Sequence, residues 1–276
     1  MIEETPSGQA SGQAIEFEDV RAGFGEGDVL RRLTFRVASR EMKVLVGESG
    51  SGKTLVMKLA AGLLRPSGGR ILLLGQDLDE LSEREMLDFR RRIGFVFQEG
   101  ALFDSLTVAD NVAYRLREEN VDEDEIEARV HESLRFVELE DAIEKMPADL
   151  SGGMRRRVSI ARALIARPEV VFYDSPTAGL DPVTSQTIIT LILRLRDLQG
   201  VTALMATHRL QDAFAMANYR FDRDTNRVVH ITGAETNGSG ARETSFLFLR
   251  DGTAYFQGTP QAVLDSEDPY LKRYLV

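Results

Sequence analysis

Apolar and polar residues alternate along residues 15–20 and again along residues 33–37. A two-residue period is typical of strands with one buried face, and the glycine-rich segment 23–27 between them predicts a turn. We therefore expect two antiparallel strands near the start of the chain. Residues 1–14 are mostly small, polar or acidic, and we expect them to form a disordered tail.

The next segment changes from a continuous apolar run to a helical pattern. Residues 42–46 are typical of a buried strand, and residues 55–64 place apolar side chains at helical spacing before Pro66. A glycine-rich loop separates them. The segment therefore has the order strand, loop, helix.

The rest of the chain divides into a helical middle and a mixed last third. Ser82 with Glu85, and Thr107 with Asp110, have the spacing of helix N-terminal caps. The last third alternates apolar strands with helices, which predicts a parallel sheet covered on both faces. Residues 222–245 break this alternation with turn formers and predict an inserted loop or hairpin.

The composition narrows the classes of protein to which the chain can belong. Lys and Arg number 34 and Asp and Glu number 44, and the net charge of −10 disfavours nucleic acid as a partner. The absence of cysteine excludes disulfide frameworks, thiolate catalysis and cysteine-bound metal centres. The three histidines, His131, His208 and His230, lack the spacing of a dedicated metal site.

The sequence has no pattern of a secretory signal or a membrane span. The first residues are acidic and small, which is the reverse of a secretory signal. No apolar run approaches the roughly 18 residues that a spanning helix needs. We expect a cytoplasmic protein, so that any membrane role depends on a membrane-embedded partner.

The strongest chemical motif is the loop GESGSGKT at residues 47–54, which satisfies G-x-x-x-x-G-K-[ST] between an apolar strand and a helix. Glycines let backbone N–H groups approach phosphates, and the helix N-terminus attracts them. We expect Lys53 to bridge the β- and γ-phosphates and the Thr54 hydroxyl to bind Mg²⁺. The residues expected to hold the nucleotide are Gly47, Glu48, Ser49, Gly50, Ser51, Gly52, Lys53 and Thr54.

A second magnesium ligand is expected at the end of another buried strand. Residues 170–173 are apolar or aromatic, and Asp174 follows them. An acid in this position is commonly a turn or capping residue, but the phosphate loop changes its interpretation. The two elements together indicate a protein that binds Mg-ATP or Mg-GTP.

Residues 150–154, LSGGM, lie between these elements and resemble the LSGGQ signature of ABC-transporter ATPases. Gln98 after one strand, residues 178–181 after Asp174, and His208 after a further strand complete the motif order of that family. We therefore identify the chain as a member of it.

The resemblance implies the fold. The implied fold would be an α/β P-loop NTPase of the ABC type, with a mixed central sheet, an antiparallel β subdomain and a helical subdomain at about residues 81–165. A single domain would span residues 15–275, with residues 222–245 as an insertion that departs from the family pattern.

The resemblance also implies roles for individual residues. Phe24 would stack on the adenine, and Gln98 would contact Mg²⁺ and the attacking water. His208 would contact the γ-phosphate and the same water, and Asp181 would belong to the nucleotide site. The implied metal ligands are Thr54, Gln98 and Asp174, and the implied catalytic residues are Asp174, Ser175, His208 and Gln98.

The signature implies a dimer. In the family, the residues corresponding to Ser151, Gly152 and Gly153 reach across a two-fold axis to the γ-phosphate held by the second copy. ATP would therefore join two copies of this chain.

One position departs from the family. The residue after Asp174 is normally a glutamate that polarises the attacking water, and here it is Ser175. Loss of such a group costs about 10²- to 10⁴-fold in rate, so we expect ATP binding and dimerisation with slow hydrolysis. Three accounts stay open: His208 and Gln98 hold the water, the protein is a nucleotide-gated clamp, or the serine was introduced to trap ATP.

Within the family, residues 100–103 and 110–114, the Met154 form of the signature, and residues 268–275 look most like the ATPase of Mla/Mce-type phospholipid transporters. The expected partners are a second copy of the chain, an integral membrane permease and a small accessory subunit. The chain would lie on the cytoplasmic face of the inner membrane.

Two other readings remain. One is a regulatory ABC ATPase that acts as an ATP-gated clamp, and the other is an importer subunit for a different small solute. A DNA-repair ATPase is disfavoured because the segment between Lys53 and Ser151 has no coiled-coil heptads. A small-molecule kinase is disfavoured because such kinases lack the signature.

Overall fold

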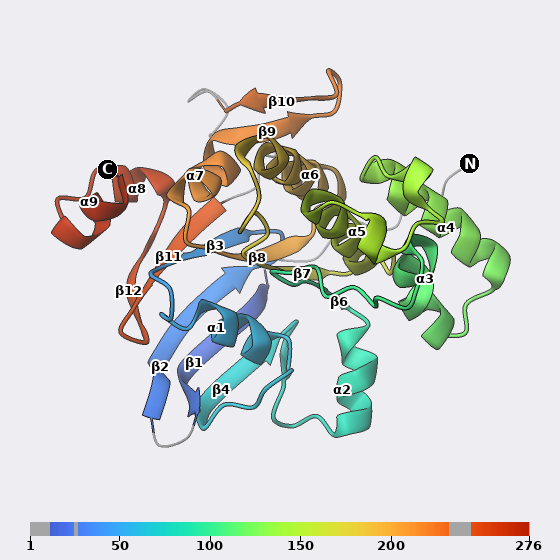
Figure 1. Cartoon of the computed structure of the whole chain (residues 1–276). Helices are drawn as coiled ribbons and strands as arrows, with labels where there is room; N and C mark the ends of the chain where they lie inside the picture. The colour runs from blue at the N-terminus through green and yellow to red at the C-terminus, as the bar shows by residue number, and fades with distance from the viewer. Residues whose placement is uncertain (1–11, 25–26, 232–243, 276) are drawn as a thin grey trace.

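The computed structural model describes residues 12–24, 27–231 and 244–275. A six-stranded sheet with the order β12-β11-β3-β8-β7-β6 forms the centre (Figure 1). Its strands are β3 (Met42–Val46), β6 (Ile93–Val96), β7 (Val170–Asp174), β8 (Thr202–Thr207), β11 (Thr244–Arg250) and β12 (Thr253–Gly258). Only β12 pairs antiparallel within this sheet, so the predicted mixed sheet is confirmed.

The antiparallel subdomain is a four-stranded sheet with the order β2-β1-β4-β5. Its strands are β1 (Gln13–Phe24), β2 (Gly27–Ala38), β4 (Gly68–Leu73) and β5 (Gln76–Asp77). Strand β1 begins at Gln13, so the predicted tail of residues 1–14 is too long by two residues. The reason is that Ala14 is buried and its carbonyl accepts a hydrogen bond of 2.7 Å from the Leu74 amide. Residues 1–11 of that tail lie outside the described residues.

Two apolar cores lie on opposite faces of the central sheet. On one face, α1 (Lys53–Ala60) and the four-stranded sheet share a core in which the rings of Phe17 and Phe35 stack at 4.6 Å. On the other face lie α5 (Gly152–Leu164), α6 (Pro182–Gln199) and α7 (Leu210–Asn218) (Figure 1). The continuous apolar strands β3, β7 and β8 are buried along their whole lengths because both faces are covered.

The helical region begins at α2 (Glu83–Arg90) and continues through α3 (Val108–Glu118) and α4 (Glu123–Phe136) to α5. Both predicted caps are present: Ser82 and Glu85 form a capping box, and the Thr107 hydroxyl accepts a hydrogen bond of 3.1 Å from the Asp110 amide. Short 3₁₀ turns occupy Glu140–Ala142 and Pro147–Asp149. The predicted range 81–165 also contains β6, which belongs to the central sheet because it pairs with β7.

The last third adds a small hairpin and two helices. Strands β9 (Tyr219–Asp222) and β10 (Arg227–His230) form a two-stranded sheet at the start of the predicted insertion, and residues 232–243 of that insertion lie outside the described residues. Helices α8 (Pro260–Leu264) and α9 (Pro269–Leu275) follow.

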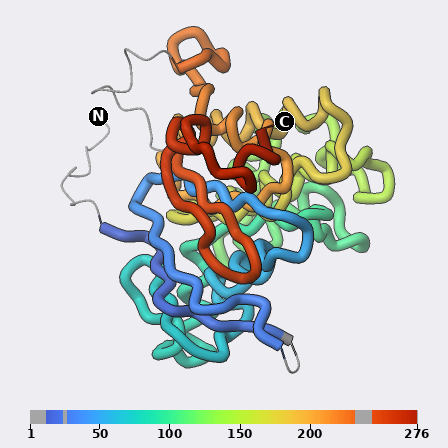
Figure 2. The backbone as a smooth tube through the Cα atoms, turned by 90° about the vertical axis from the view of Figure 1, so that its left-hand side faces the viewer, coloured from blue at the N-terminus to red at the C-terminus, as the bar shows by residue number. Residues whose placement is uncertain are grey.

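The hairpin of β11 and β12 links the central sheet to the antiparallel subdomain. Figure 2 shows this hairpin alongside the blue strands, and the Arg31 amide donates a hydrogen bond of 2.8 Å to the Gly252 carbonyl. Within the described residues, no helix has the length and apolarity that a bilayer crossing needs.

Candidate nucleotide-binding site

Four neighbouring parallel strands end at the same edge of the central sheet. The order is β3, β8, β7, β6, with Val46 opposite Thr207, Ala206 opposite Asp174, and Tyr173 opposite Val96. The phosphate loop, His208, Asp174 with Ser175, and Gln98 each follow one of these strands. The fold therefore brings together motifs that lie up to 161 positions apart (47 to 208) in the sequence.

The phosphate loop, residues 47–54, has a backbone that glycine makes possible. A Cβ on Gly47 would lie 2.7 Å from the Leu249 carbonyl oxygen and 2.7 Å from the Ser51 hydroxyl. Gly52 has φ of 98°, in the left-handed region that side chains disfavour. The loop is thus held against β11 in a conformation that leaves its open side to a ligand.

The Lys53 ammonium lies inside this loop. Its side chain is largely buried, and Nζ donates hydrogen bonds to the carbonyls of Gly47 and Glu48, both at 2.8 Å, and to the Ser51 hydroxyl at 3.3 Å. Burial lowers the pKa of Lys53, against the opposing attraction of Asp174. A buried cation among weak neutral acceptors is well placed to transfer its hydrogen bonds to phosphate oxygens.

The first turn of α1 favours an anion. Gly52 is the N-cap residue and makes no side-chain cap, and the first turn contains no acidic residue. The orphan N–H groups and the partial positive charge of the helix start therefore face the loop.

Two oxygen ligands suited to Mg²⁺ meet beside Lys53. The Thr54 hydroxyl donates a hydrogen bond of 3.2 Å to the Asp174 carboxylate, whose other close donor is the Ser175 hydroxyl at 3.4 Å. These hard oxygen donors fit magnesium, which commonly takes few protein ligands beside the phosphates of its nucleotide. No group of three or more His, Asp or Glu that could hold a metal occurs in the described part of the chain.

The loop that carries Gln98 is held by the signature helix. Residues 97–100 form a turn in which the Gly100 amide donates to the Phe97 carbonyl at 3.0 Å. From α5, Arg156 donates to the same carbonyl at 2.8 Å, and Arg162 donates to the carbonyls of Gly100 at 2.9 Å and Ala101 at 2.7 Å. Gln98 is exposed on this fixed turn.

Sequence reasoning missed both arginines, although Arg156 lies two residues after the signature and Arg162 lies six residues further along α5. Burial lowers the pKa of Arg156 and of Arg162, and for Arg156 the attraction of Asp174 and Glu99 opposes that effect. Long-range contacts of this kind have no local pattern. The run of arginines at 155–157 was a local signal for Arg156, and Arg162 lies outside it.

His208 lies at the edge of the site. It follows β8, its side chain is exposed, and a turn holds its backbone because the Arg209 amide donates to the Thr207 hydroxyl at 3.0 Å. The backbone of Phe24 ends β1, opposite Gly27, but its side chain lies outside the described residues.

The signature residues lie at the start of α5. Ser151 caps α5, its hydroxyl accepting from the Met154 amide at 3.2 Å, and Ser151 and Gly152 are exposed. In the described part of the chain, no hydrogen bond or ion pair joins residues 151–153 to the phosphate loop. Asp181 caps α6 by accepting from the amides of Val183 and Thr184, both at 3.0 Å.

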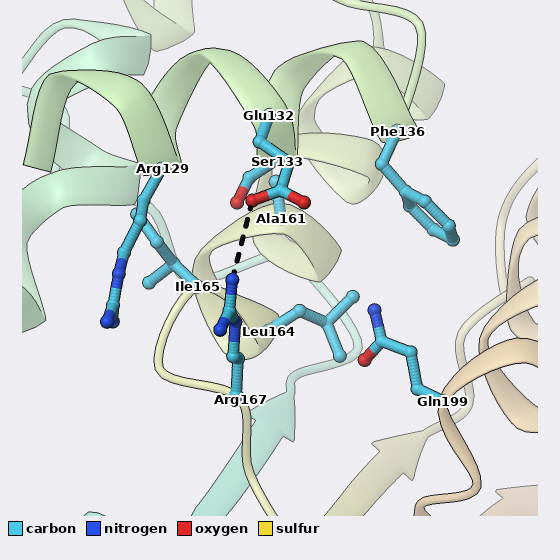
Figure 3. Close-up of a pocket in the computed structure, with 9 residues that line it drawn as sticks. All are labelled: Arg129, Glu132, Ser133, Phe136, Ala161, Leu164, Ile165, Arg167 and Gln199. Atoms are coloured by element: carbon cyan, nitrogen blue, oxygen red, sulfur yellow. Dashed lines mark ion pairs between the residues drawn. The ribbon is translucent and has the colours of Figure 1, made fainter. Parts of the chain in front are cut away.

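Two hollows differ in their fitness for a nucleotide. An open hollow of about 540 Å³ lies beside the phosphate loop, between residues 28–31, 48–51 and Arg273. A smaller pocket of about 80 Å³ lies between α4 and α5, where Arg167 pairs with Glu132 at 3.7 Å (Figure 3). Because ligand sites commonly measure 300–1,000 Å³, the first hollow has the appropriate size.

The parallel strand ends, the phosphate loop and the Thr54–Asp174 pair define a P-loop nucleotide-binding protein. A model of the family "ABC transporter" matches residues 30–178, and the chain belongs to this family. The resemblance inferred from the signature is thereby confirmed.

Known relatives differ in what they transport. The chain is 41% identical over 219 residues to the methionine import ATP-binding protein MetN 1 of Rhodococcus jostii, covering 78% of this chain and 65% of that protein. It is 36% identical over 216 residues to the intermembrane phospholipid transport system ATP-binding protein MlaF of Haemophilus influenzae. This match covers 78% of this chain and 82% of that protein. The chain thus spans less than two thirds of the first relative.

A solved structure supports the fold. The ATP-binding cassette MJ0796, a dimer in a post-hydrolysis state bound to ADP and Pi, matches with a TM-score of 0.74 at 26% identity, covering 89% of this chain and 98% of that one. The predicted ABC-type fold is confirmed.

Proposed function

We propose that the chain is the ATP-binding subunit of an ABC transporter and that it binds and hydrolyses Mg-ATP. The observation that carries this proposal is the position of Lys53 and of the Thr54–Asp174 pair at one edge of the sheet. Lys53 and the backbone N–H groups of residues 47–54 bind the β- and γ-phosphates. Thr54, Asp174 and Gln98 hold Mg²⁺, which neutralises charge on the phosphates.

The active form is a dimer in which two ATP molecules lie between two copies of the chain. Ser151, Gly152 and Gly153 of one copy contact the γ-phosphate held by the other. The dimeric state of the MJ0796 cassette supports this arrangement. His208 contacts the γ-phosphate, Asp181 lines the dimer interface near the nucleotide, and Phe24 stacks on the adenine.

A membrane permease binds at an aromatic surface formed by Phe103 and Tyr114. Phe103 and Tyr114 are 42% and 41% exposed, and their rings lie 4.6 Å apart. The buried Asn111 side chain fixes this surface, because it accepts from the Phe103 amide at 2.8 Å and donates to the Phe103 carbonyl at 3.0 Å. Two rigidly held, exposed aromatic rings are typical of a docking surface.

The transported substrate is phospholipid or a related lipid. The support for this choice is the likeness of residues 100–103 and 110–114 to Mla/Mce-type ATPases, together with the 36% identity to MlaF. The chain lies on the cytoplasmic face of the inner membrane, bound to its permease.

Residues 222–245 form a docking surface for a neighbouring subunit, such as a small accessory protein. Deleting them would leave complex assembly unchanged if that assignment is wrong.

A second candidate is a regulatory ABC ATPase that uses ATP to close a clamp. The Ser175 hydroxyl, which donates to Asp174, favours it because no carboxylate stands at that position. Co-purification distinguishes the two functions. A transporter subunit purifies with an integral membrane protein, whereas the clamp forms a stable complex that contains no membrane protein.

The deciding experiment measures steady-state ATPase activity and ATP-dependent dimerisation, with and without the permease in phospholipid vesicles. Turnover stimulated by the permease and by phospholipid supports the transporter. Stimulation by methionine instead identifies an importer for a small solute, and stable ATP-dependent dimers with negligible turnover identify the clamp.

A further inference from the structure

Two loops that leave the nucleotide edge of the central sheet lie side by side. The first, residues 175–181, follows β7 and leads into α6. The second, residues 207–212, runs from the end of β8 into the first turn of α7 and carries His208. Because β7 and β8 are parallel neighbours, the loops start together, and the Ser175 amide donates a hydrogen bond of 2.9 Å to the Ala206 carbonyl.

The buried carboxylate of Asp212 joins these two loops. Asp212 is 5% exposed, and Thr177, in the middle of the first loop, is 1% exposed. The Thr177 hydroxyl donates a hydrogen bond to Oδ2 of Asp212, and Nε of Arg209 lies 3.8 Å from the same oxygen. A carboxylate is costly to bury unless it is hydrogen-bonded and paired, so these contacts hold the two loops in one arrangement.

Arg209, the residue after His208, extends the connection to the start of α6. Its Nη1 donates a hydrogen bond of 3.0 Å to the hydroxyl of Ser185, which is itself buried and donates to the Leu180 carbonyl at 3.5 Å. The first loop is therefore tied to the second at two places, its middle and the residues that follow it.

We propose that Asp212 is a positioning residue that couples the loop of His208 to loop 175–181. The inference rests on the proposed function, in which His208 contacts the γ-phosphate and Asp181 lines the dimer interface. A γ-phosphate that holds His208 in place also fixes loop 175–181 through Asp212, and Asp181 is then presented to the second copy. Because ADP lacks that phosphate, the connection favours dimerisation with ATP over dimerisation with ADP.

The test compares Thr177→Val with Thr244→Val, two matched losses of a buried threonine hydroxyl. Thr244 begins β11, opposite Met42 at the other end of the sheet from the phosphate loop, and its hydroxyl donates to the Met216 carbonyl at 3.2 Å. With Mg²⁺ and a non-hydrolysable ATP analogue, Thr177→Val should weaken dimerisation by about tenfold, as expected for the loss of one hydrogen bond to a carboxylate. Binding of the analogue to dilute protein should stay within about twofold, since the phosphate loop is unchanged. Thr244→Val should dimerise like the wild type in sedimentation experiments.

Rescue and a double-mutant cycle separate coupling from a general loss of stability. Thr177→Ser keeps the hydroxyl and should restore dimerisation to within about twofold of the wild type. Thr177→Val should cause no further loss of dimerisation when it is added to Asp212→Ala, because either change alone breaks the same contact. Additive losses overturn the inference, as do dimerisation of Thr177→Val equal to that of the wild type and an equal loss in Thr244→Val. A wild type that does not bind the analogue, or stays monomeric with it, overturns the proposed function instead.

Discussion

Thr54 and Asp174, 120 positions apart in the sequence, are joined by a hydrogen bond of 3.2 Å from hydroxyl to carboxylate. The contact joins the start of α1, which follows β3, to the end of β7. Strand β8 lies between β3 and β7 in the sheet. Because the two oxygens already lie together, a magnesium ion that binds them requires little rearrangement of the chain.

Asp174→Asn should remove the magnesium dependence of ATP binding. The neutral amide is a weaker ligand for a hard cation, so the gain in ATP affinity on adding Mg²⁺ should disappear while binding in EDTA stays within about twofold. Titration with a fluorescent ATP analogue measures both. Glu169→Gln, at the opposite end of β7, is the control because its carboxylate pairs with Arg92 at 2.6 Å. Retained magnesium dependence in Asp174→Asn would remove Asp174 from the metal site.

Lys53→Ala should weaken ATP binding by about 10- to 100-fold. The reason is that hydrogen bonds to charged groups contribute about 1.5–3 kcal/mol. Lys58→Ala on the same helix is the matched control, since Lys58 lies in the last turn of α1, away from the loop. An equal loss of ATP affinity in the two variants would show that the change in net charge, and not the loss of a contact with phosphate, weakens binding.

Local sequence patterns predicted the parts of this fold that depend on neighbours in the chain. The phosphate loop, the Ser82 and Thr107 caps and the β1–β2 hairpin each follow from residues within a few positions. The start of β1 did not follow, because its pairing with residues near Leu74 is long-range.

The candidate site was predicted through its motifs, and the residues around those motifs were missed. Arg156 and Arg162 act on residues 97–101 from about 60 positions away, and no local period encodes that contact.

Gly153→Ala should destabilise the protein, whereas Gly152→Ala should not. A Cβ on Gly153 would lie 2.3 Å from Thr184 Cγ2, but one on Gly152 would lie 3.7 Å from the Leu180 side chain, an ordinary contact. Overpacking commonly costs about 1–3 kcal/mol, which lowers the melting temperature by several degrees. Thr184→Ser removes the clashing methyl group and should restore stability to Gly153→Ala. A failure of this rescue would mean that the helix backbone, not Thr184, sets the requirement for glycine.

Arg162→Met should loosen the loop that carries Gln98. The substitution leaves the carbonyls of Gly100 and Ala101 without their donors, so amide hydrogen exchange across residues 97–101 should become faster. Arg167→Met is the control, because Arg167 pairs with Glu132 at 3.7 Å on the surface (Figure 3). An unchanged rate of amide hydrogen exchange in Arg162→Met would show that the turn is stable without the hydrogen bonds from Arg162.

The start of α3 should make stability depend on pH in the acid range. Hydrogen bonds from Thr107 at 2.6 Å and Arg117 at 2.7 Å lower the pKa of Asp110 below its ordinary value of 3.8. A carboxyl with a lowered pKa stabilises the fold above its unfolded pKa, and this contribution is lost as the pH falls through the folded pKa. Asp110→Asn should therefore melt about 1–2 °C below the wild type at pH 6, and the difference should shrink below pH 3.8. Asp104→Asn removes an exposed acid of the preceding loop and should give no such pH-dependent difference. If the melting temperature of Asp110→Asn lies below that of the wild type by the same amount at every pH, its effect arises from packing.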